Sequence, residues 1–336
     1  MTPATASPAD LQPGARNAVR VCLGVQPSER VTVITDRVCR DIADALVAEI
    51  ARVGAPYRLF VLEDEAPRPL AALPRTIAAD LELSQVSIFA ARALAHELGS
   101  RMQMTDIVNR RRMRHAHMVN ITPQIMSDGM RADYAVVDRI SSRVLETVRR
   151  ASRIRATTLA GTAVEATFNP AYRWIKTSGL ITPEKWGNLP GGEVFTTPAE
   201  VNGTFVIDGV VGDWLCEKYG RLDRTPLTIR VERNRLVEAT SANADLREDF
   251  WRYTHTDENS DRVGEFAIGT NIEIRQVIGQ ILQDEKFPGV HMAFGNPYGA
   301  HTGADWYSST HIDVVGTEFD IWADEAPLMR RGQFLI

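Results

Sequence analysis

The sequence predicts an α/β N-terminal domain, built on a parallel sheet of Rossmann-like topology, followed by an α+β C-terminal domain. Two observations carry this prediction. Short apolar strands alternate with amphipathic helices over roughly the first 150 residues, a pattern typical of a parallel sheet with helices on both faces. Beyond that point strands follow one another with few helices between them, which favours antiparallel pairing. With 336 residues, the chain is long enough for two such domains.

The first domain, with an N-terminal leader, is placed at residues 1–152. Residues 1–28 read as a polar leader that leads into a helix, and the leader lacks the apolar core of a signal peptide. No glycine-rich nucleotide motif follows the first strand, so we expect no nucleotide cofactor. Apolar, β-branched runs predict strands at 29–36, 57–62, 85–90 and 115–121, and periodic apolar residues predict helices at 41–53, 69–82, 93–113 and 131–152.

The second domain is placed at residues 153–336 and is expected to be the metal-binding domain, for reasons given below. It begins with a strand, a turn and a strand over 153–168, and it ends in a strand and a hairpin-like segment over 318–336. One helix is predicted, at 243–253. Further strands are predicted at 192–198, 203–209, 227–231, 235–240, 263–269, 290–294 and 310–315.

Composition excludes several classes of protein. The chain is 44% hydrophobic and 24% charged with a net charge of −5, so no nucleic-acid partner is expected. No uninterrupted apolar run is long enough to cross a bilayer, so no membrane partner is expected either. The three cysteines, Cys22, Cys39 and Cys216, are scattered and form neither a metal motif nor a disulfide framework. This usage predicts a cytoplasmic protein.

Residues 288–317 are the stretch richest in groups that carry chemistry. They contain His291, His301 and His311, three of the seven histidines in the chain. His311 and Asp313 lie two residues apart in a predicted strand and therefore point to one face. Such a pair is half of a metal site, or a base with the group that orients it.

The turn at 295–299 is predicted to direct Tyr298 back towards the strand that carries His291. His301 follows in a loop flanked by glycines and is expected to line an entrance or to face solvent. His115 and His117 also alternate on a strand, but no carboxylate lies near them in sequence. We interpret these two as core or interface residues.

Two acids occupy strands that are otherwise apolar. Glu193 follows two glycines, and Glu265 lies between Gly264 and an apolar run. A carboxylate in such a strand is paired, protonated or bound to a cation, unless it lies at an edge facing water. The candidate ligands are oxygen and imidazole donors without thiolate, which suit Zn, Mn, Co or Fe(II). Together these candidates provide more ligands than one zinc ion needs, and they suit two ions bridged by a carboxylate. The candidates are Glu193, Glu265, His291, Tyr298, His311 and Asp313.

Four segments together resemble the thermophilic metalloaminopeptidases of the aminopeptidase T and S group. They are 188–198 (NLPGGEVFTTP), 264–268 (GEFAI), 291–298 (HMAFGNPY) and 309–313 (STHID). The resemblance implies that Glu193, Glu265, His291, Tyr298, His311 and Asp313 bind a pair of Zn, Co or Mn ions. It also implies catalytic roles for Glu193, Glu265 and Tyr298, the last as a ligand or an oxyanion donor.

The activity implied is that of a metal-dependent hydrolase, which uses a metal-activated water to cleave a peptide or amide bond. The substrate would be the N-terminal residue of a short peptide or a small-molecule amide. The family also implies a homodimer or a higher homo-oligomer. The chain is shorter than typical members, has Gly192-Glu193 where the family has two adjacent acids, and has a shortened interval between Tyr298 and His311.

A divergent branch, the dihydroxypyridine ring-cleaving dioxygenases, is an alternative that the sequence leaves open. These enzymes share the His-x-Asp strand but hold one Fe(II) in a site of two histidines and one carboxylate. A histidine stands there where this chain has Glu265, so Glu265 and Glu193 favour the hydrolase, whereas the reduced length favours the dioxygenase. A third hypothesis is a two-domain binding protein whose site has degenerated.

Overall fold

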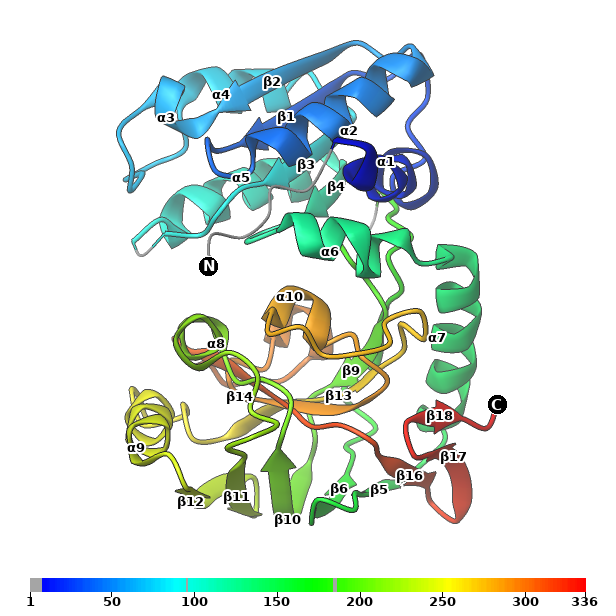
Figure 1. Ribbon diagram of the computed structural model, residues 1–336, viewed down its shortest axis with the longest axis vertical. Helices are drawn as coiled ribbons and strands as arrows, with labels where there is room; N and C mark the ends of the chain where they lie inside the picture. The colour runs from blue at the N-terminus through cyan, green and yellow to red at the C-terminus, as the bar shows by residue number, and fades with distance from the viewer. Residues whose placement is uncertain (1–7, 95, 184–185) are drawn as a thin grey trace. The chain divides into compact units, whose positions relative to one another are not determined.

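A computed structural model describes residues 8–94, 96–183 and 186–336 of the chain (Figure 1). The polypeptide divides into two compact units. The N-terminal unit comprises residues 1–134 and 179–191, and the C-terminal unit comprises residues 135–178 and 192–336. Residues 1–7 of the predicted leader lie outside the described residues, and the rest of it contains α1 (Pro8–Arg16) and the π-helix Asn17–Cys22.

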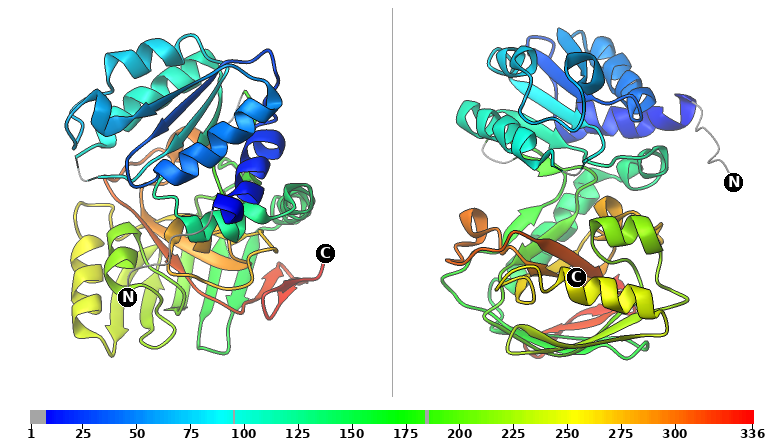
Figure 2. Two further views of the ribbon diagram at one scale, coloured as in Figure 1. Left: turned by 45° about the horizontal axis from the view of Figure 1, so that its top comes forward. Right: turned by 90° about the vertical axis from the view of Figure 1, so that its left-hand side faces the viewer.

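The N-terminal unit contains a sheet, drawn mainly in blue and cyan in Figure 2. Its five strands have the order β2-β1-β3-β4-β8. Every neighbouring pair in it is parallel, and β1 and β3 are buried along their whole length. The predicted α/β class with a parallel sheet is therefore confirmed. The strands are β1 (Val31–Thr35), β2 (Tyr57–Val61), β3 (Val86–Ala90), β4 (Arg114–His117) and β8 (Gly187–Asn188). The helices that follow α1 are α2 (Arg40–Val53), α3 (Leu62–Glu65), α4 (Arg75–Leu81), α5 (Leu98–Arg111), α6 (Pro123–Ser127) and the 3₁₀ turn Gly129–Arg131.

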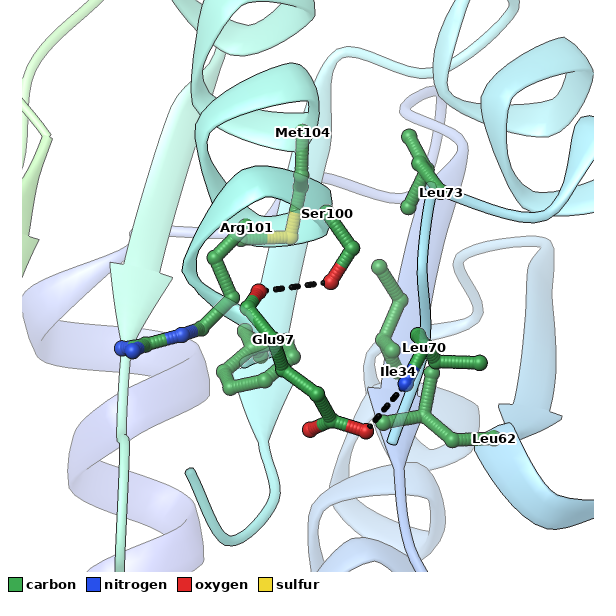
Figure 3. A pocket seen from close by; sticks show the side chains of 9 residues that line it. Ile34, Leu62, Leu70, Leu73, Glu97, Ser100, Arg101 and Met104 are labelled. Atoms are coloured by element: carbon green, nitrogen blue, oxygen red, sulfur yellow. Dashed lines mark hydrogen bonds between the residues drawn. The ribbon is translucent and has the colours of Figure 1, made fainter. Parts of the chain in front are cut away.

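Apolar side chains from β1, β3, α3 and α5 line a pocket in this unit together with Glu97 (Figure 3). The Glu97 carboxylate accepts a hydrogen bond from the backbone N–H of Leu70 at 2.9 Å and pairs with Arg68 at 2.5 Å. Because its charge is compensated in this way, Glu97 is a structural acid. His115 and His117, on β4, are both buried, and His115 is hydrogen-bonded to the Ser87 hydroxyl at 2.8 Å.

The first boundary between the units follows Tyr134, the first residue of α7 (Tyr134–Val148). The sequence predicts this boundary after the helix, at residue 152. The physical reason is packing, because Val144 and Val148 of α7 belong to the hydrophobic core of the C-terminal unit. Residues 179–191 return to the N-terminal unit, where β8 pairs with β4. No motif in the sequence predicts that residues 179–191 belong to the N-terminal unit.

The C-terminal unit is built from two antiparallel sheets. The eight-stranded sheet has the order β12-β11-β10-β6-β5-β16-β17-β18, and the five-stranded sheet has the order β15-β14-β13-β9-β7. One apolar cluster contains side chains of both, including Phe205 and Ile229 from the first and Phe266 and Met292 from the second, so the two sheets pack face to face.

The strands of the larger sheet are β5 (Arg153–Thr157), β6 (Ala163–Thr167), β10 (Glu200–Ile207), β11 (Leu227–Glu232), β12 (Arg235–Ser241), β16 (Asp320–Ala323), β17 (Ala326–Arg330) and β18 (Gln333–Phe334). Those of the smaller sheet are β7 (Ile175–Thr177), β9 (Glu193–Thr196), β13 (Val263–Gly269), β14 (Gly289–Gly295) and β15 (His311–Val315). The helices are α7, α8 (Asp213–Tyr219), α9 (Ala244–Tyr253), α10 (Ile281–Asp284) and α11 (Gly299–Thr302).

The smaller sheet has two unlike faces. One packs on the larger sheet, and α8 and α10 lie over the other (Figure 1). In the described part of the chain, no helix is long and apolar enough to span a membrane.

Candidate metal centre

The register of the five-stranded sheet brings five of the six predicted ligands to one face. In antiparallel strands, residues directly opposite each other project to the same side. Glu193 lies opposite Gly269, Glu265 opposite Ala293, and His291 opposite Ala267. Asp313 is also opposite Ala293, and His311 is opposite Gly295. All five side chains therefore project from the face that is turned away from the larger sheet.

The residues that alternate with the candidate ligands form the other face. Phe266, Met292, Phe294, Ile312 and Val314 all belong to the apolar core of the unit. On the site face, Gly269, Ala267, Ala293 and Gly295 each lie opposite a ligand, while His291 also lies opposite Val315 and Glu193 opposite Thr177. Each strand thus anchors its ligand through the apolar residues beside it.

A β-bulge at Gly264 places Glu265 on the site face. The register between β13 and β14 shifts between Val263 and Glu265. Val263 belongs to the apolar core, and without the shift Glu265 would share its face, because a one-residue slip moves side chains to the other side of a sheet. Only glycine fits at 264, since a Cβ there would lie 2.2 Å from the carbonyl oxygen of Gly295.

The side chains on this face form two groups that share one residue. Glu193, Glu265 and His291 form the first group, and Glu265, His311 and Asp313 form the second. In each group, one ligand atom per residue lies within 4.8 Å of the others. The two oxygens of Glu265 face different histidines, with Oε1 3.4 Å from His291 Nε2 and Oε2 4.0 Å from His311 Nε2.

The remaining distances complete both groups. His291 Nε2 lies 3.5 Å from Glu193 Oε2, and His311 Nε2 lies 3.5 Å from Asp313 Oδ1. Hydrogen bonds from outside the groups orient two of the ligands. The Asn296 carbonyl accepts from His311 Nδ1 at 2.9 Å, which turns Nε2 towards the carboxylates. The Thr177 hydroxyl donates to Glu193 Oε1 at 2.7 Å.

The donor set fits divalent metal ions. Nε2 of His291 is buried and has no hydrogen-bond partner among the described residues, although it points at two carboxylates. Glu193, Glu265 and Asp313 are all buried, and their charges oppose one another. A cation shared between imidazole nitrogens and carboxylate oxygens satisfies both conditions. The sharing of Glu265 suits two neighbouring ions bridged by one carboxylate.

Electrostatic coupling shifts the pKa values of these groups. Burial alone would lower the pKa of His291, but the carboxylates of Glu193 and Glu265 raise it to about 10. Burial would likewise lower the pKa of His311, but the carboxylates of Asp313 and Glu265 raise it to about 10. Burial would raise the pKa of Glu193, but Lys286 and His291 hold it well below its usual value.

Tyr298 and His301 lie differently from the other candidates. The backbone of Tyr298 is left-handed, with φ of 50°, and its ring packs against the His311 imidazole with centroids 4.5 Å apart. The centroid of the ring also lies 6.5 Å from that of the Phe195 ring on β9. The strand of His291, β14, towards which the sequence predicts that the turn directs Tyr298, lies between β15 and β9. The role of Tyr298 as a ligand or oxyanion donor stays a prediction. His301 is exposed, as expected for an entrance or solvent-facing residue.

Sequence reasoning missed several residues that support the site. Lys286 and Glu285 lie beside Glu193, within a charged run (284–286) that reads in sequence as a solvated loop. Asp257 holds the segment that leads into β15. Its carboxylate accepts hydrogen bonds from the backbone N–H of Ser309 at 2.7 Å and from the Ser308 hydroxyl at 3.0 Å. No periodicity or motif marks any of these contacts, because they join loops distant in sequence.

Replacing Gly264 tests the bulge. We expect Gly264→Ala to displace β13, to lower the free energy of unfolding by about 2 kcal/mol or more, and to reduce metal binding because Glu265 moves. Urea unfolding and metal analysis measure both effects. Gly99→Ala is the matched control, since a Cβ there meets nothing within 4 Å. Unchanged metal content in Gly264→Ala would contradict the role of the bulge.

Two histidine variants test the assignment of ligands. We expect His311→Ala to lose bound metal while the fold survives, because it removes a nitrogen ligand and leaves carboxylates that repel one another. His301→Ala is expected to keep its metal because His301 is exposed. Elemental analysis of both purified variants, with circular dichroism to verify folding, measures the difference. Metal loss in His301→Ala alone would show that the assignment is wrong.

The stability of chelator-treated protein is expected to depend on pH. The pKa values of His291 and His311 rise from 6.5 to about 10 on folding, so their protonation stabilises the fold fully below pH 6.5. That contribution is lost as pH rises through about 10. Glu285 acts in the same direction, because burial raises its pKa from 4.5 to about 8. The urea midpoint should therefore fall as the pH rises from 6.5 to about 10, and fall less in His291→Gln. A rising midpoint would contradict these shifts.

Comparison with solved structures confirms the fold. A 2,5-dihydroxypyridine dioxygenase from Pseudomonas putida KT2440 is similar over 98% of both chains, with a TM-score of 0.72 and 15% identity. Wild-type AmpT from Thermus thermophilus is similar over 98% of this chain and 99% of its own, with a TM-score of 0.69 and 18% identity. At these identities the likeness establishes the architecture, and it extends over nearly all of the chain.

Sequence comparison establishes the family. Among curated proteins no relative matches the chain. Residues 141–334, more than half of the chain, match the thermophilic metalloprotease family M29. This region contains every residue of the two ligand groups, and the resemblance inferred from the four segments is confirmed. The chain therefore belongs to the thermophilic metalloprotease (M29) family.

Proposed function

We propose that this metallohydrolase cleaves a peptide or amide bond, either at the N-terminal residue of a short peptide or in a small-molecule amide. The observation that carries the proposal is the pair of ligand groups joined by Glu265. Each group offers one imidazole and two carboxylates, a donor set that suits Zn, Co or Mn. A second group beside the first is what a two-ion hydrolytic centre needs.

Divalent ions in these groups would supply an acidified water and polarise the substrate carbonyl. The residues of the chain hold and orient the reacting parts. Glu265 presents one oxygen to each histidine and thereby sets the spacing of the two groups. Glu193 is held at Oε1 by Thr177, so its carboxylate keeps one orientation while it serves the first group.

Tyr298 is proposed to donate a hydrogen bond to the oxyanion that forms when water adds to the carbonyl. Although the residue as a whole is 42% exposed, desolvation of its hydroxyl and the nearby carboxylates of Glu265 and Asp313 raise the pKa of that hydroxyl well above the ordinary value. The phenol therefore keeps its proton at neutral pH and remains a donor. Its packing against His311 places it beside the second group.

The alternative is a ring-cleaving dioxygenase with one Fe(II), which the similar fold of the 2,5-dihydroxypyridine dioxygenase supports. A mononuclear Fe(II) centre of that kind uses two histidines and one carboxylate. Each group in this chain has the opposite ratio, one histidine to two carboxylates. The donor ratio therefore favours the hydrolase.

We further propose a cytoplasmic homodimer or higher homo-oligomer that acts on small molecules or short peptides. The three cysteines of the chain are free and buried, which fits a reducing compartment. Sedimentation of the purified protein measures the oligomeric state directly.

The hydrolase proposal is tested with Zn-, Co- or Mn-loaded protein and a panel of aminoacyl anilides, dipeptides and small amides. We expect hydrolysis of at least one substrate class and a loss of about 100-fold or more in Glu265→Gln, because the shared ligand is removed. Glu238→Gln, on the exposed β12, is the matched control. Oxygen uptake with a dihydroxypyridine and Fe(II)-loaded protein, without hydrolysis, would show that the dioxygenase alternative is right.

A further inference from the structure

Lys286 is a buried lysine that lies against the first ligand group. Its side chain is only 1% exposed. The ammonium Nζ lies 2.7 Å from Glu193 Oε2 and 2.5 Å from Glu285 Oε1. A buried ammonium is stable only when an anion compensates its charge. Glu193 supplies that charge, and Glu285 Oε1 provides a second polar contact.

The fold brings this lysine to the site through a close backbone approach. Gly269 lies on the site face of β13, directly opposite Glu193. A Cβ at that position would lie 1.9 Å from the carbonyl oxygen of Phe287, so only glycine lets the segment after α10 pack there. The Lys286 carbonyl also accepts a hydrogen bond from the backbone N–H of Asn271 at 3.0 Å. The close packing of this segment against β13 therefore fixes the position of Lys286.

The oxygen that Lys286 binds is the one that the first group requires. Glu193 Oε2 lies 3.5 Å from His291 Nε2, whereas Oε1 is occupied by the Thr177 hydroxyl. An ion that binds through the Glu193 oxygen facing His291 therefore shares Oε2 with an ammonium. The positive charge of Lys286 opposes that ion and offsets one of the carboxylate charges that attract it.

The second group has no lysine in ion-pair contact among the described residues, although the charge of Lys286 also acts on Asp313 from farther away. Among ion pairs between described residues, Asp313 pairs with His311 alone, and Glu265 pairs with His291 and His311. The two groups have the same donor types, one histidine and two carboxylates, but only the first has a carboxylate in direct contact with an ammonium among the described ion pairs.

We propose that Lys286 makes the two metal positions unequal, with a tight ion at Glu265, His311 and Asp313 and a weaker, exchangeable ion at Glu193, Glu265 and His291. The inference rests on the proposed two-ion centre and names a residue that regulates its loading. Lys286 acts as a positioning residue: it holds Glu193 Oε2 and lowers the affinity of that position by charge. Glu285 holds the ammonium in place.

Isothermal titration of chelator-treated protein with Co(II) or Zn(II) tests the proposal without reference to activity. We expect two binding steps in the wild-type chain and a weak step at least about tenfold tighter in Lys286→Met, because a nearby unit charge strongly affects a divalent ion. The tight step should change little. Lys218→Met is the matched control, because that lysine is half exposed and pairs with Asp249.

Two further variants assign the weak step and guard against misfolding. Thr177→Val removes the other contact of Glu193 without changing the charge, so the weak step should become weaker, the opposite of Lys286→Met. His291→Gln should abolish the weak step and leave the tight one. Circular dichroism of each chelated variant verifies folding.

The results separate the two proposals. Equal affinities in the wild-type chain, or a weak step that is unchanged or weakened in folded Lys286→Met, would overturn the role of Lys286 and leave the hydrolase intact. Absence of any metal binding in the wild-type chain would overturn both. Two-ion binding without hydrolysis of any substrate would overturn the proposed activity alone.

Discussion

The C-terminal unit is dominated by one electrostatic constraint, the accumulation of buried carboxylates on a single sheet face. Glu193, Glu265 and Asp313 are each less than 7% exposed. Carboxylates so close together and so far from water repel one another, and their burial is costly unless cations compensate them. Two histidines with raised pKa values and one buried lysine supply that compensation within the chain. Divalent ions would compensate the same carboxylate charges, and the arrangement is therefore typical of a metal centre.

The same strands that carry these charges also carry the core. Glu265 is followed by Phe266, His291 by Met292, and Asp313 is flanked by apolar residues of the sheet interface. Every second side chain packs between the two sheets, so displacing a ligand requires moving a core residue as well. Side chains on strands anchored in this way are held more closely than side chains on loops. The centre therefore has the rigidity of the core, except where Tyr298 and the loop after it contribute.

Much of this arrangement could be predicted from the sequence because period-two alternation is visible there. The spacing of His311 and Asp313 indicates their shared face, and Glu265 stands out in an apolar strand. The bulge could not be predicted, since Gly264 resembles an ordinary strand glycine until the partner strand supplies the clash with Gly295. Lys286 was missed for a related reason: its neighbours in sequence are charged and polar, and its burial depends on Gly269, which is distant in the chain. The boundary at residue 134 could not be predicted, because an amphipathic helix such as α7 can pack its apolar face on either unit.

Position 265 is also where the donor set of this face could change most with a single substitution. Glu265 is the only residue common to both ligand groups of the described chain. An imidazole there would convert the group with His311 and Asp313 into two histidines and one carboxylate, the donor set of mononuclear Fe(II) oxygenases. It would also remove the second oxygen that reaches His291, and with it the bridge to a second ion. The side chain at 265 projects from the site face, whereas Phe266 beside it packs in the core. The donor set of this face therefore depends on a single residue that a shared architecture does not specify.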